Sequence, residues 1–263
     1  MEHPIFSKIE HANKPDFGDI LSKSFELFKK VWEQALYHAL VSMVVVIPMI
    51  LLIYIPYIAF IFYLGGFDSY HSYDSYAYYN EPDITPYIPV LILYVIAIFI
   101  LIFLVQAVVY GITAHFIRVL KKADMGTTEN VGGYFDLIRG NFKKLLLLSL
   151  ATFGIAFAAV LACYLPIFYV MVPLQLVVVF FAFHPELSVS EIIKASFKLG
   201  NKFWLTIFGL MIVAGLIAQL GILLCIVGVF VTAFFVHIPM YFIYKDTVGL
   251  SLVTDRNTTP TGL

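Results

Sequence analysis

Long apolar runs without a single charged residue alternate with short segments that carry Lys, Arg, Asp and Glu. The four runs cover 34–67, 84–117, 145–185 and 203–244. A helix needs about 20 apolar residues to cross the hydrocarbon part of a bilayer. The first two runs are too short for two crossings, whereas the last two are long enough. We therefore expect one long crossing in each of the first two runs and a hairpin of two crossings in each of the last two.

Within the runs the apolar residues are continuous rather than alternating. The segment from Leu145 reads LLLLSLATFGIAFAAVLA, whereas the strands of a membrane barrel alternate apolar and polar residues over about ten positions. The sequence thus predicts an all-α integral membrane protein with six transmembrane helices in one domain, residues 1–263. The segment 1–19 lacks the apolar core of a cleavable signal peptide. We expect the first crossing to stay as an uncleaved anchor.

Composition and charge distribution agree with a membrane protein. Hydrophobic residues make up 61% of the chain and charged residues 13%, against about 25% charged residues in soluble domains. None of the 16 Lys and Arg lies in 65–85, which instead holds Asp68, Asp74, Glu81 and Asp83. Because basic segments stay in the cytoplasm, we predict a bacterial inner-membrane protein with both termini cytoplasmic and loop 65–86 periplasmic. The expected partners are membrane lipids and another membrane protein, not nucleic acid.

One amphipathic phrase occurs twice, each time just before an apolar run. Residues 20–32 read ILSKSFELFKKVW and residues 192–204 read IIKASFKLGNKFW, with six identities in thirteen positions. A weaker copy, YFDLIRGNFKKLLLL, begins at Tyr134. Apolar residues three and four apart with Lys opposite are typical of a helix that lies in the membrane interface. We expect such in-plane cytoplasmic helices at 17–30, 131–142 and 188–200.

The repeated phrase divides the chain into three units, each an in-plane helix followed by a transmembrane hairpin. The units cover approximately residues 16–122, 127–186 and 187–246, and residues 247–263 form a cytoplasmic tail. Units that cross the membrane an even number of times share one orientation. This predicts a threefold pseudo-repeat about the membrane normal.

The pattern SVSEIIKASFKLGNKFWLTIFGLM followed by LLCIVGVFVTAFFVHIPMYFIYKD resembles a group of bacterial multi-pass proteins. The group includes the membrane domain attached to some glycerophosphodiester phosphodiesterases and stand-alone chains in Bacteroidetes. The resemblance covers about the last 120 residues directly and the rest through the repeats. It implies a helical membrane domain with no assigned catalytic residues. The chain has no room for the phosphodiesterase domain, so that activity is not expected here.

No catalytic motif stands out. Phosphate-binding loops, CxxC pairs, HExxH and GxSxG do not occur in the sequence, and glycines alone do not make a nucleotide site. We predict no catalytic residue and no cofactor. The basic residues beside the runs are candidates for contacts with anionic lipid head groups, at about 1 kcal/mol each, or they only follow the positive-inside rule. They are Lys23, Lys29, Lys30, Arg139, Lys143, Lys144, Lys194, Lys198 and Lys202.

Two further features on the opposite side leave alternatives open. Loop 65–86 is rich in Tyr, which lines membrane interfaces and also forms recognition surfaces. The candidates for an outer partner surface are Tyr70, Tyr73, Tyr76, Tyr78 and Tyr79. Cys163 and Cys225 lie near the outer ends of the third and fifth crossings. They form a disulfide or act as small hydrophobic residues.

Few polar residues lie inside the expected crossings. They are Gln106, Gln175, Gln219, His38, His115 and His237. His38 and His115 are each expected about 9 Å into the membrane from the cytoplasmic end of their helices. Such residues hydrogen-bond across helices or line the pathway of an uncharged substrate. His38, His115, His184 and His237 are weak candidates for a metal or haem site, because no pair has the spacing of bundle metal sites; we predict no metal.

Three function classes fit these features. The first is a non-enzymatic scaffold or accessory subunit of a membrane complex. The second is a carrier or binder of lipid or another hydrophobic small molecule. The third is a metal- or haem-dependent membrane enzyme. We rank them in this order because ionisable residues inside spans mark ion pathways and catalytic sites, and the runs contain no Asp, Glu, Lys or Arg.

Overall fold

The computed structural model describes residues 3–63, 84–162, 164–221 and 226–250. These ranges contain helices, turns and no β-strand, which confirms the predicted all-α fold for them. The longer helices are α2 (Phe17–Tyr63), α3 (Ile88–Met125), α4 (Asp136–Leu161), α5 (Leu165–Phe183), α6 (Val189–Lys202), α7 (Trp204–Leu220) and α9 (His237–Val248). The shorter elements are α1 (Pro4–His11), η2 (Thr85–Tyr87), α8 (Ile226–Thr232) and η4 (Ala233–Val236).

Several helices are long and apolar enough to cross a membrane. Among the described residues there are five such segments, or six if α6 and α7, which meet at a bend of 92°, form one span. The third apolar run holds α4 and α5, as expected. The fourth holds α7 and then α8, η4 and α9, which follow one another without a gap and include the candidate span Gly228–Val248. The multi-pass class is confirmed, while six crossings in three hairpins stay a prediction.

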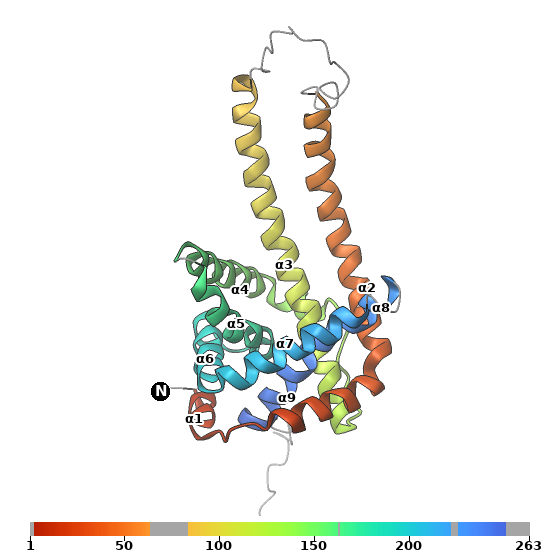
Figure 1. The fold of residues 1–263 in the computed structure, drawn as a ribbon, viewed down its shortest axis with the longest axis vertical. Helices are drawn as coiled ribbons and strands as arrows, with labels where there is room; N and C mark the ends of the chain where they lie inside the picture. The colour runs from red at the N-terminus through yellow and green to blue at the C-terminus, as the bar shows by residue number, and fades with distance from the viewer. Residues whose placement is uncertain (1–2, 64–83, 163, 222–225, 251–263) are drawn as a thin grey trace, which may run out of the picture.

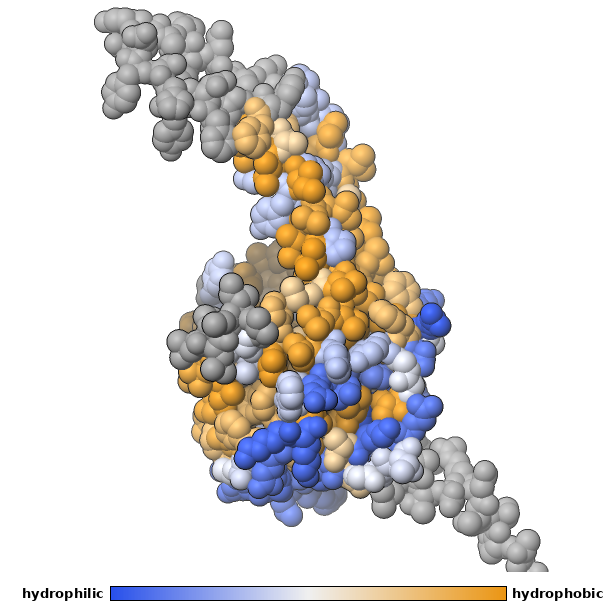
Figure 2. Space-filling model, turned by 90° about the vertical axis from the view of Figure 1, so that its right-hand side faces the viewer, coloured by the Kyte–Doolittle hydropathy of each residue, from blue (hydrophilic) through white to orange (hydrophobic). Residues whose placement is uncertain are grey.

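The upper parts of α2 and α3 extend well beyond the other helices (Figure 1). No side chain between residues 44 and 62 of α2 or between 88 and 104 of α3 is buried; we call these two stretches the arm. At a rise of about 1.5 Å per residue, α2 is about 70 Å long and α3 about 57 Å, against about 30 Å for the apolar part of a bilayer. Figure 2 shows apolar side chains over the arm and hydrophilic ones gathered at the opposite end of the molecule.

The two copies of the repeated phrase make the same local contacts. The Ser24 hydroxyl donates to the carbonyl of Ile20 at 2.7 Å and the Ser196 hydroxyl to that of Ile192 at 2.8 Å, and all four residues are fully buried. The first copy nevertheless continues into α2 without a break, and α2 curves from the base of the molecule into the arm (Figure 1). The second copy forms α6, a separate helix.

The segment expected as an in-plane helix at 131–142 is only partly helical. Helix α4 begins at Asp136, and the backbone of Asn141 is non-helical (φ −134°, ψ 20°), which kinks α4 at the Gly140-Asn141 pair. The sequence therefore located the break correctly but overestimated the helix in front of it.

The sequence analysis did not identify helix α1, although its signal is present. His3 accepts a hydrogen bond as the N-cap, Pro4 occupies the first turn, and Ile5, Phe6 and Ile9 bury one face. The Lys202 ammonium at the end of α6 donates to the carbonyls of Ile9, Glu10 and Ala12 at 3.0, 2.5 and 2.8 Å. Glu10 lies in the last turn of α1, where backbone carbonyls lack intrahelical donors, and Ala12 is the C-cap. Lys202 thus links α1 to the end of α6.

Helices α5 and α6 pack closely because Gly200 has no side chain. A Cβ at this position would lie 2.8 Å from the Pro173 Cα and 3.1 Å from its nitrogen. Both are backbone atoms of α5, which cannot rotate away. This contact holds α6, the second copy of the repeated phrase, against α5.

Candidate functional site

Two buried histidines on α2 and α3 contact each other. The distance from His38 Nε2 to His115 Nδ1 is 2.8 Å, and the rings stack with centroids 5.1 Å apart at 25°. The outer nitrogens contact backbone carbonyls: His38 Nδ1 lies 2.6 Å from the Gln34 oxygen, and His115 Nε2 lies 3.1 Å from the Gly132 oxygen. The pair therefore ties α2, α3 and the segment before α4 together.

Aromatic rings surround this pair. Tyr134 lies 4.7 Å from the His38 ring and 4.9 Å from the His115 ring, measured between centroids. Phe116 and Phe234 lie 5.1 and 5.9 Å from His38. The relative exposure of His38 is 0% and that of His115 is 5%. The sequence placed both histidines at similar depth, and the structure brings them into contact.

The geometry of the pair is that of a hydrogen bond and not of a shared metal ion. Two nitrogens bound to one zinc ion at about 2.0–2.1 Å are roughly 3.3 Å apart in tetrahedral geometry. The observed separation of 2.8 Å is shorter. Within the ranges that the structure describes, no three His, Cys, Asp or Glu side chains are grouped to hold a metal.

His115 also lines an open cavity of about 610 Å³, which we call the basic cavity. Lys30 of α2 and Lys122 of α3 line it as well, and Gly126 ends α3 there with a left-handed backbone (φ 63°). The Thr127 hydroxyl oxygen is buried and has no hydrogen-bond partner among the described residues. The other residues of the lining are Val31, Gln34, Val119, Ala123, Asn130, Val131, Gly132 and Tyr134. Burial raises the pKa of the Tyr134 phenol, with a further contribution from Tyr37, so this group stays a hydrogen-bond donor.

A second cavity lies between α3, α5 and the start of α9 and has a volume of about 370 Å³. It collects three of the six polar residues that the sequence placed inside the apolar runs: Gln106, Gln175 and His237. Tyr110 and Thr113 add hydroxyl groups, and Val109, Met171, Leu174 and Val178 complete the apolar lining. We call it the glutamine cavity. Apolar walls with a few convergent polar groups are typical of small-molecule sites of about 300–1,000 Å³.

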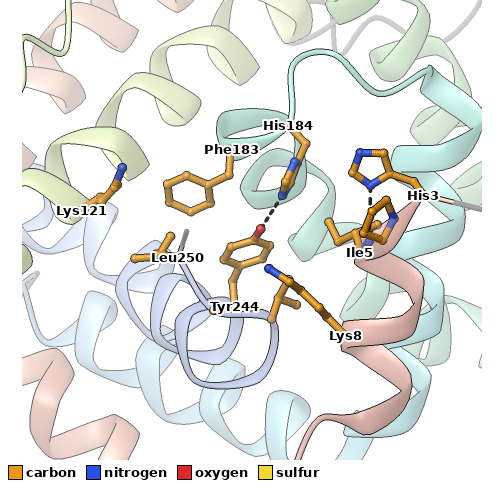
Figure 3. A pocket seen from close by; sticks show the side chains of 11 residues that line it. His3, Ile5, Lys8, Lys121, Phe183, His184, Tyr244 and Leu250 are labelled. Atoms are coloured by element: carbon orange, nitrogen blue, oxygen red, sulfur yellow. Dashed lines mark hydrogen bonds between the residues drawn. The ribbon is translucent and has the colours of Figure 1, made fainter. Parts of the chain in front are cut away.

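His184 lies apart from the other histidines, beside a smaller cavity of about 140 Å³. Its Nε2 is 2.7 Å from the Tyr244 hydroxyl and its Nδ1 is 2.8 Å from a Glu186 carboxylate oxygen. Figure 3 shows His184 and Tyr244 on one side of this cavity, with Lys8 of α1 beside them and Lys121 of α3 across from them. These contacts join α1, α5 and α9.

The candidate head-group residues fall into two classes. Four make contacts within the chain. Lys23 pairs with Asp19 and Asp246 at 2.6 and 3.3 Å, Lys144 donates to the Pro185 carbonyl at 2.5 Å, Lys198 pairs with Glu10 at 3.0 Å, and Lys202 holds α1. In the described part of the chain the others form no ion pair: Lys29, Lys30, Arg139, Lys143 and Lys194. Of all nine, only Lys30 lines the basic cavity.

Several residues that form these cavities were not expected from the sequence. Arg118, Lys121 and Lys122 are at the end of α3, and the Arg118 Nε donates to the Ala182 carbonyl at 2.8 Å. The sequence analysis did not single these three residues out as candidates. The candidates Tyr70, Tyr73, Tyr76, Tyr78 and Tyr79, together with Cys163 and Cys225, lie outside the described residues.

No protein-family model matches the chain. Searches among curated proteins and among solved structures likewise find no match. The function must therefore be argued from the cavities and helices themselves.

Proposed function

We propose that this chain is a multi-pass membrane protein that binds a lipid or another hydrophobic small molecule with one polar end in the glutamine cavity. The observation that supports this most directly is the convergence of Gln106, Gln175 and His237 on one cavity inside the apolar runs. Polar side chains inside spans are uncommon and cluster where helices bond one another or where a ligand passes. Here they surround a space.

The chemistry of the lining defines the ligand class. Each glutamine amide supplies two donors and an acceptor, and Tyr110 and Thr113 supply hydroxyls, so a neutral hydroxyl, amide or ester group is matched. The Tyr110 hydroxyl already contacts the Thr152 hydroxyl at 3.0 Å, which fixes its direction. No charged side chain is part of the lining. A fully charged head group is thus not the part of the ligand that this cavity suits.

The test is to identify small molecules that stay with the protein during purification. Protein extracted in a mild detergent is analysed by native mass spectrometry, followed by lipid extraction. We expect a stoichiometric ligand that is lost from the double variant Gln106→Leu, Gln175→Leu. The control is Gln219→Leu, because Gln219 is the third glutamine of the runs but is exposed and does not line the cavity. Equal retention in all three proteins, or no bound ligand in the wild type, contradicts the proposal.

The arm favours a second candidate, the scaffold or accessory role. Pro48 and Pro56 lie inside α2 and have no N–H, so the carbonyls of Val44 and Leu52 lose their usual helical donors. Val44 and Leu52 are 73% and 60% exposed. A backbone carbonyl without a donor costs several kcal/mol in hydrocarbon. A neighbouring membrane protein can supply donors that lipid tails lack.

Photo-crosslinking in native membranes tests the scaffold role. A photoreactive residue replaces Leu52 or Leu93 on the arm, and Leu205 on α7 serves as the control because it is 77% exposed but lies on the body. We expect a discrete protein adduct from the arm positions and none from position 205. Lipid adducts alone at all three positions contradict a protein partner on the arm.

The resemblance to the membrane domain of glycerophosphodiester phosphodiesterases supports both candidates equally, since it implies a membrane domain without assigned catalytic residues. In both, we propose inner-membrane localisation with cytoplasmic termini, following the distribution of Lys and Arg. We also propose the arrangement of six crossings in three hairpins. The separation of apolar arm and hydrophilic base in Figure 2 is consistent with this orientation.

A further inference from the structure

The contacts of His38 and His115 require more protons than two neutral rings carry. The outer contact of each ring is to a backbone carbonyl oxygen, of Gln34 and of Gly132. A carbonyl oxygen only accepts, so both outer ring nitrogens must carry a hydrogen. A neutral imidazole has one N–H. Two neutral rings therefore use both of their hydrogens in the outer contacts.

The inner contact then lacks a hydrogen. His38 Nε2 and His115 Nδ1 face each other at 2.8 Å, which is a hydrogen-bond distance. Without a proton between them, two lone pairs repel each other at this distance. One additional proton satisfies all three contacts at once and gives the pair a single positive charge.

We propose that His38 and His115 form a binding site for one proton, which the two rings share across their inner contact. His38 is fully buried, and His115 borders the basic cavity, so the proton enters and leaves through that cavity. The site is separate from the glutamine cavity, and the inference does not depend on the function proposed above.

The surroundings contain groups that favour the charge and groups that oppose it. The ring centroids of Tyr134, Phe116 and Phe234 lie within 6 Å of the His38 ring centroid, and a ring that presents its face at this distance stabilises a cation. The titratable or charged groups that face the pair are Lys30 and Tyr37 on α2, Arg118 and Lys122 on α3, Tyr134 and Asp136 at the start of α4, and His237 beside Phe234.

Asp136 is the one acid among these groups, and its carboxylate accepts from the Gly133 N–H at 2.6 Å. Three cationic side chains and burial oppose the added charge, while Asp136, the carbonyls and the rings favour it. We expect the proton to be bound at the acidic end of the pH range and to leave as the pH rises, because its release removes the added positive charge. Release leaves one of the three contacts without a hydrogen, so the link between α2, α3 and Gly132 loosens.

Nitrogen NMR of the full-length protein tests the site. The protein is produced with nitrogen-15-labelled histidine, placed in lipid nanodiscs and recorded between pH 5 and 8. The variants His38→Phe and His115→Phe assign the signals, and His184→Phe is the control, because His184 contacts Tyr244 and Glu186 away from the pair. In the wild type we expect three N–H hydrogens on the pair at the acidic end, with one inner nitrogen changing from bare to protonated in a single step.

The variants separate sharing from ordinary titration. In His115→Phe, we expect His38 to lose the three-proton state and to titrate alone at a different pH, while His184→Phe leaves the pair unchanged. Three hydrogens on the pair at acidic pH support the proposal, whether or not one leaves at alkaline pH. Two hydrogens throughout, or two rings that each titrate independently, overturn it. The wild-type spectra decide the question even if a variant fails to fold.

Discussion

The tight contact between α5 and α6 can be tested by adding one methyl group. Gly200→Ala places a Cβ within 2.8–3.1 Å of three atoms of Pro173, two of which belong to the backbone. The repeated sequence supplies the control. Gly140 occupies the matching position of the Gly-Asn pair, and a Cβ there meets no atom within 4 Å. Gly140→Ala therefore adds the same methyl group without the clash.

The expected difference follows from two opposing effects. Replacing Gly by Ala inside a helix stabilises it by up to about 1 kcal/mol, and this applies to both variants. Overpacking against a rigid neighbour costs about 1–3 kcal/mol, and this applies only to Gly200→Ala. We expect Gly140→Ala to be neutral or slightly stabilising and Gly200→Ala to be less stable than Gly140→Ala by about 1–3 kcal/mol.

The measurement is unfolding of the purified variants in one detergent, followed by circular dichroism as a function of denaturant. Monodispersity in size-exclusion chromatography shows that each variant is folded before unfolding. If the two variants unfold at the same denaturant concentration, the close approach of α6 to Pro173 is not present in the protein. The packing that holds α6 in place would then have to be revised.

The remaining predictions concern the helix formed by the second copy of the repeated phrase, its contact with α1, and the topology. Ser188→Ala removes the capping box of α6 and should cost about 0.5–2 kcal/mol in the same unfolding assay. Hydrogen bonds from the Ser188 hydroxyl and N–H lower the pKa of Glu191 below its ordinary value of 4.5. The ionised carboxylate therefore stabilises the folded protein above pH 4.5, and this contribution is lost as the pH falls below it. Glu191→Gln should remove this part of the acid sensitivity of unfolding. Lys202→Met should release α1 and speed proteolysis of the N-terminus, whereas Lys194→Met, with no ion pair in the described part of the chain, should not. The topology is tested with Tyr164→Cys, in the connection between α4 and α5, in a variant whose two native cysteines are replaced by Ser. If α4 and α5 form a crossing hairpin, this cysteine should react with a membrane-impermeant thiol reagent added outside intact cells. Reaction only after lysis refutes that hairpin.

Much of the fold follows directly from the sequence. Inside the hydrocarbon of a membrane every backbone N–H and C=O group needs a hydrogen-bond partner within the protein, and a long apolar run meets this need by forming a helix. The positions of α2, α3, α4 and α5 agree with the charge-free runs. The repeated phrase was also informative at single residues: Ser24 and Ser196, matched by sequence alone, are both buried and make the same hydrogen bond.

The sequence did not predict how the helices are broken or tilted. The second half of the last run is long and apolar enough for a span, as expected, but it changes locally from α-helix to 3-10 helix in η4. Run length is set by the absence of charges, whereas close approaches depend on packing: a Cβ at Gly221 would lie 2.6 Å from the Gly228 carbonyl oxygen. Such contacts depend on three-dimensional packing, and hydropathy does not encode them.

The histidine pair shows a similar limit. Counting the helical rise from the nearest charged or interfacial residue places His38 and His115 at the same depth, but depth does not determine which face of a helix a residue occupies. The structure adds the rotation of α2 and α3 that brings Nε2 and Nδ1 together. It also separates His184, which bonds Tyr244 and Glu186, from this pair.

The polar residues of the apolar runs thus serve two physically different purposes. At His38 and His115 every ring nitrogen contacts a partner within the chain, so the pair acts on helix packing and on one proton. In the glutamine cavity, Gln106 and Gln175 face a space of about 370 Å³, and an amide has more hydrogen-bonding groups than one neighbouring side chain uses. Removing a histidine should therefore disturb the contact between α2 and α3 whether or not a ligand is present. Removing both glutamines should leave the fold intact and change only what the protein retains from the membrane.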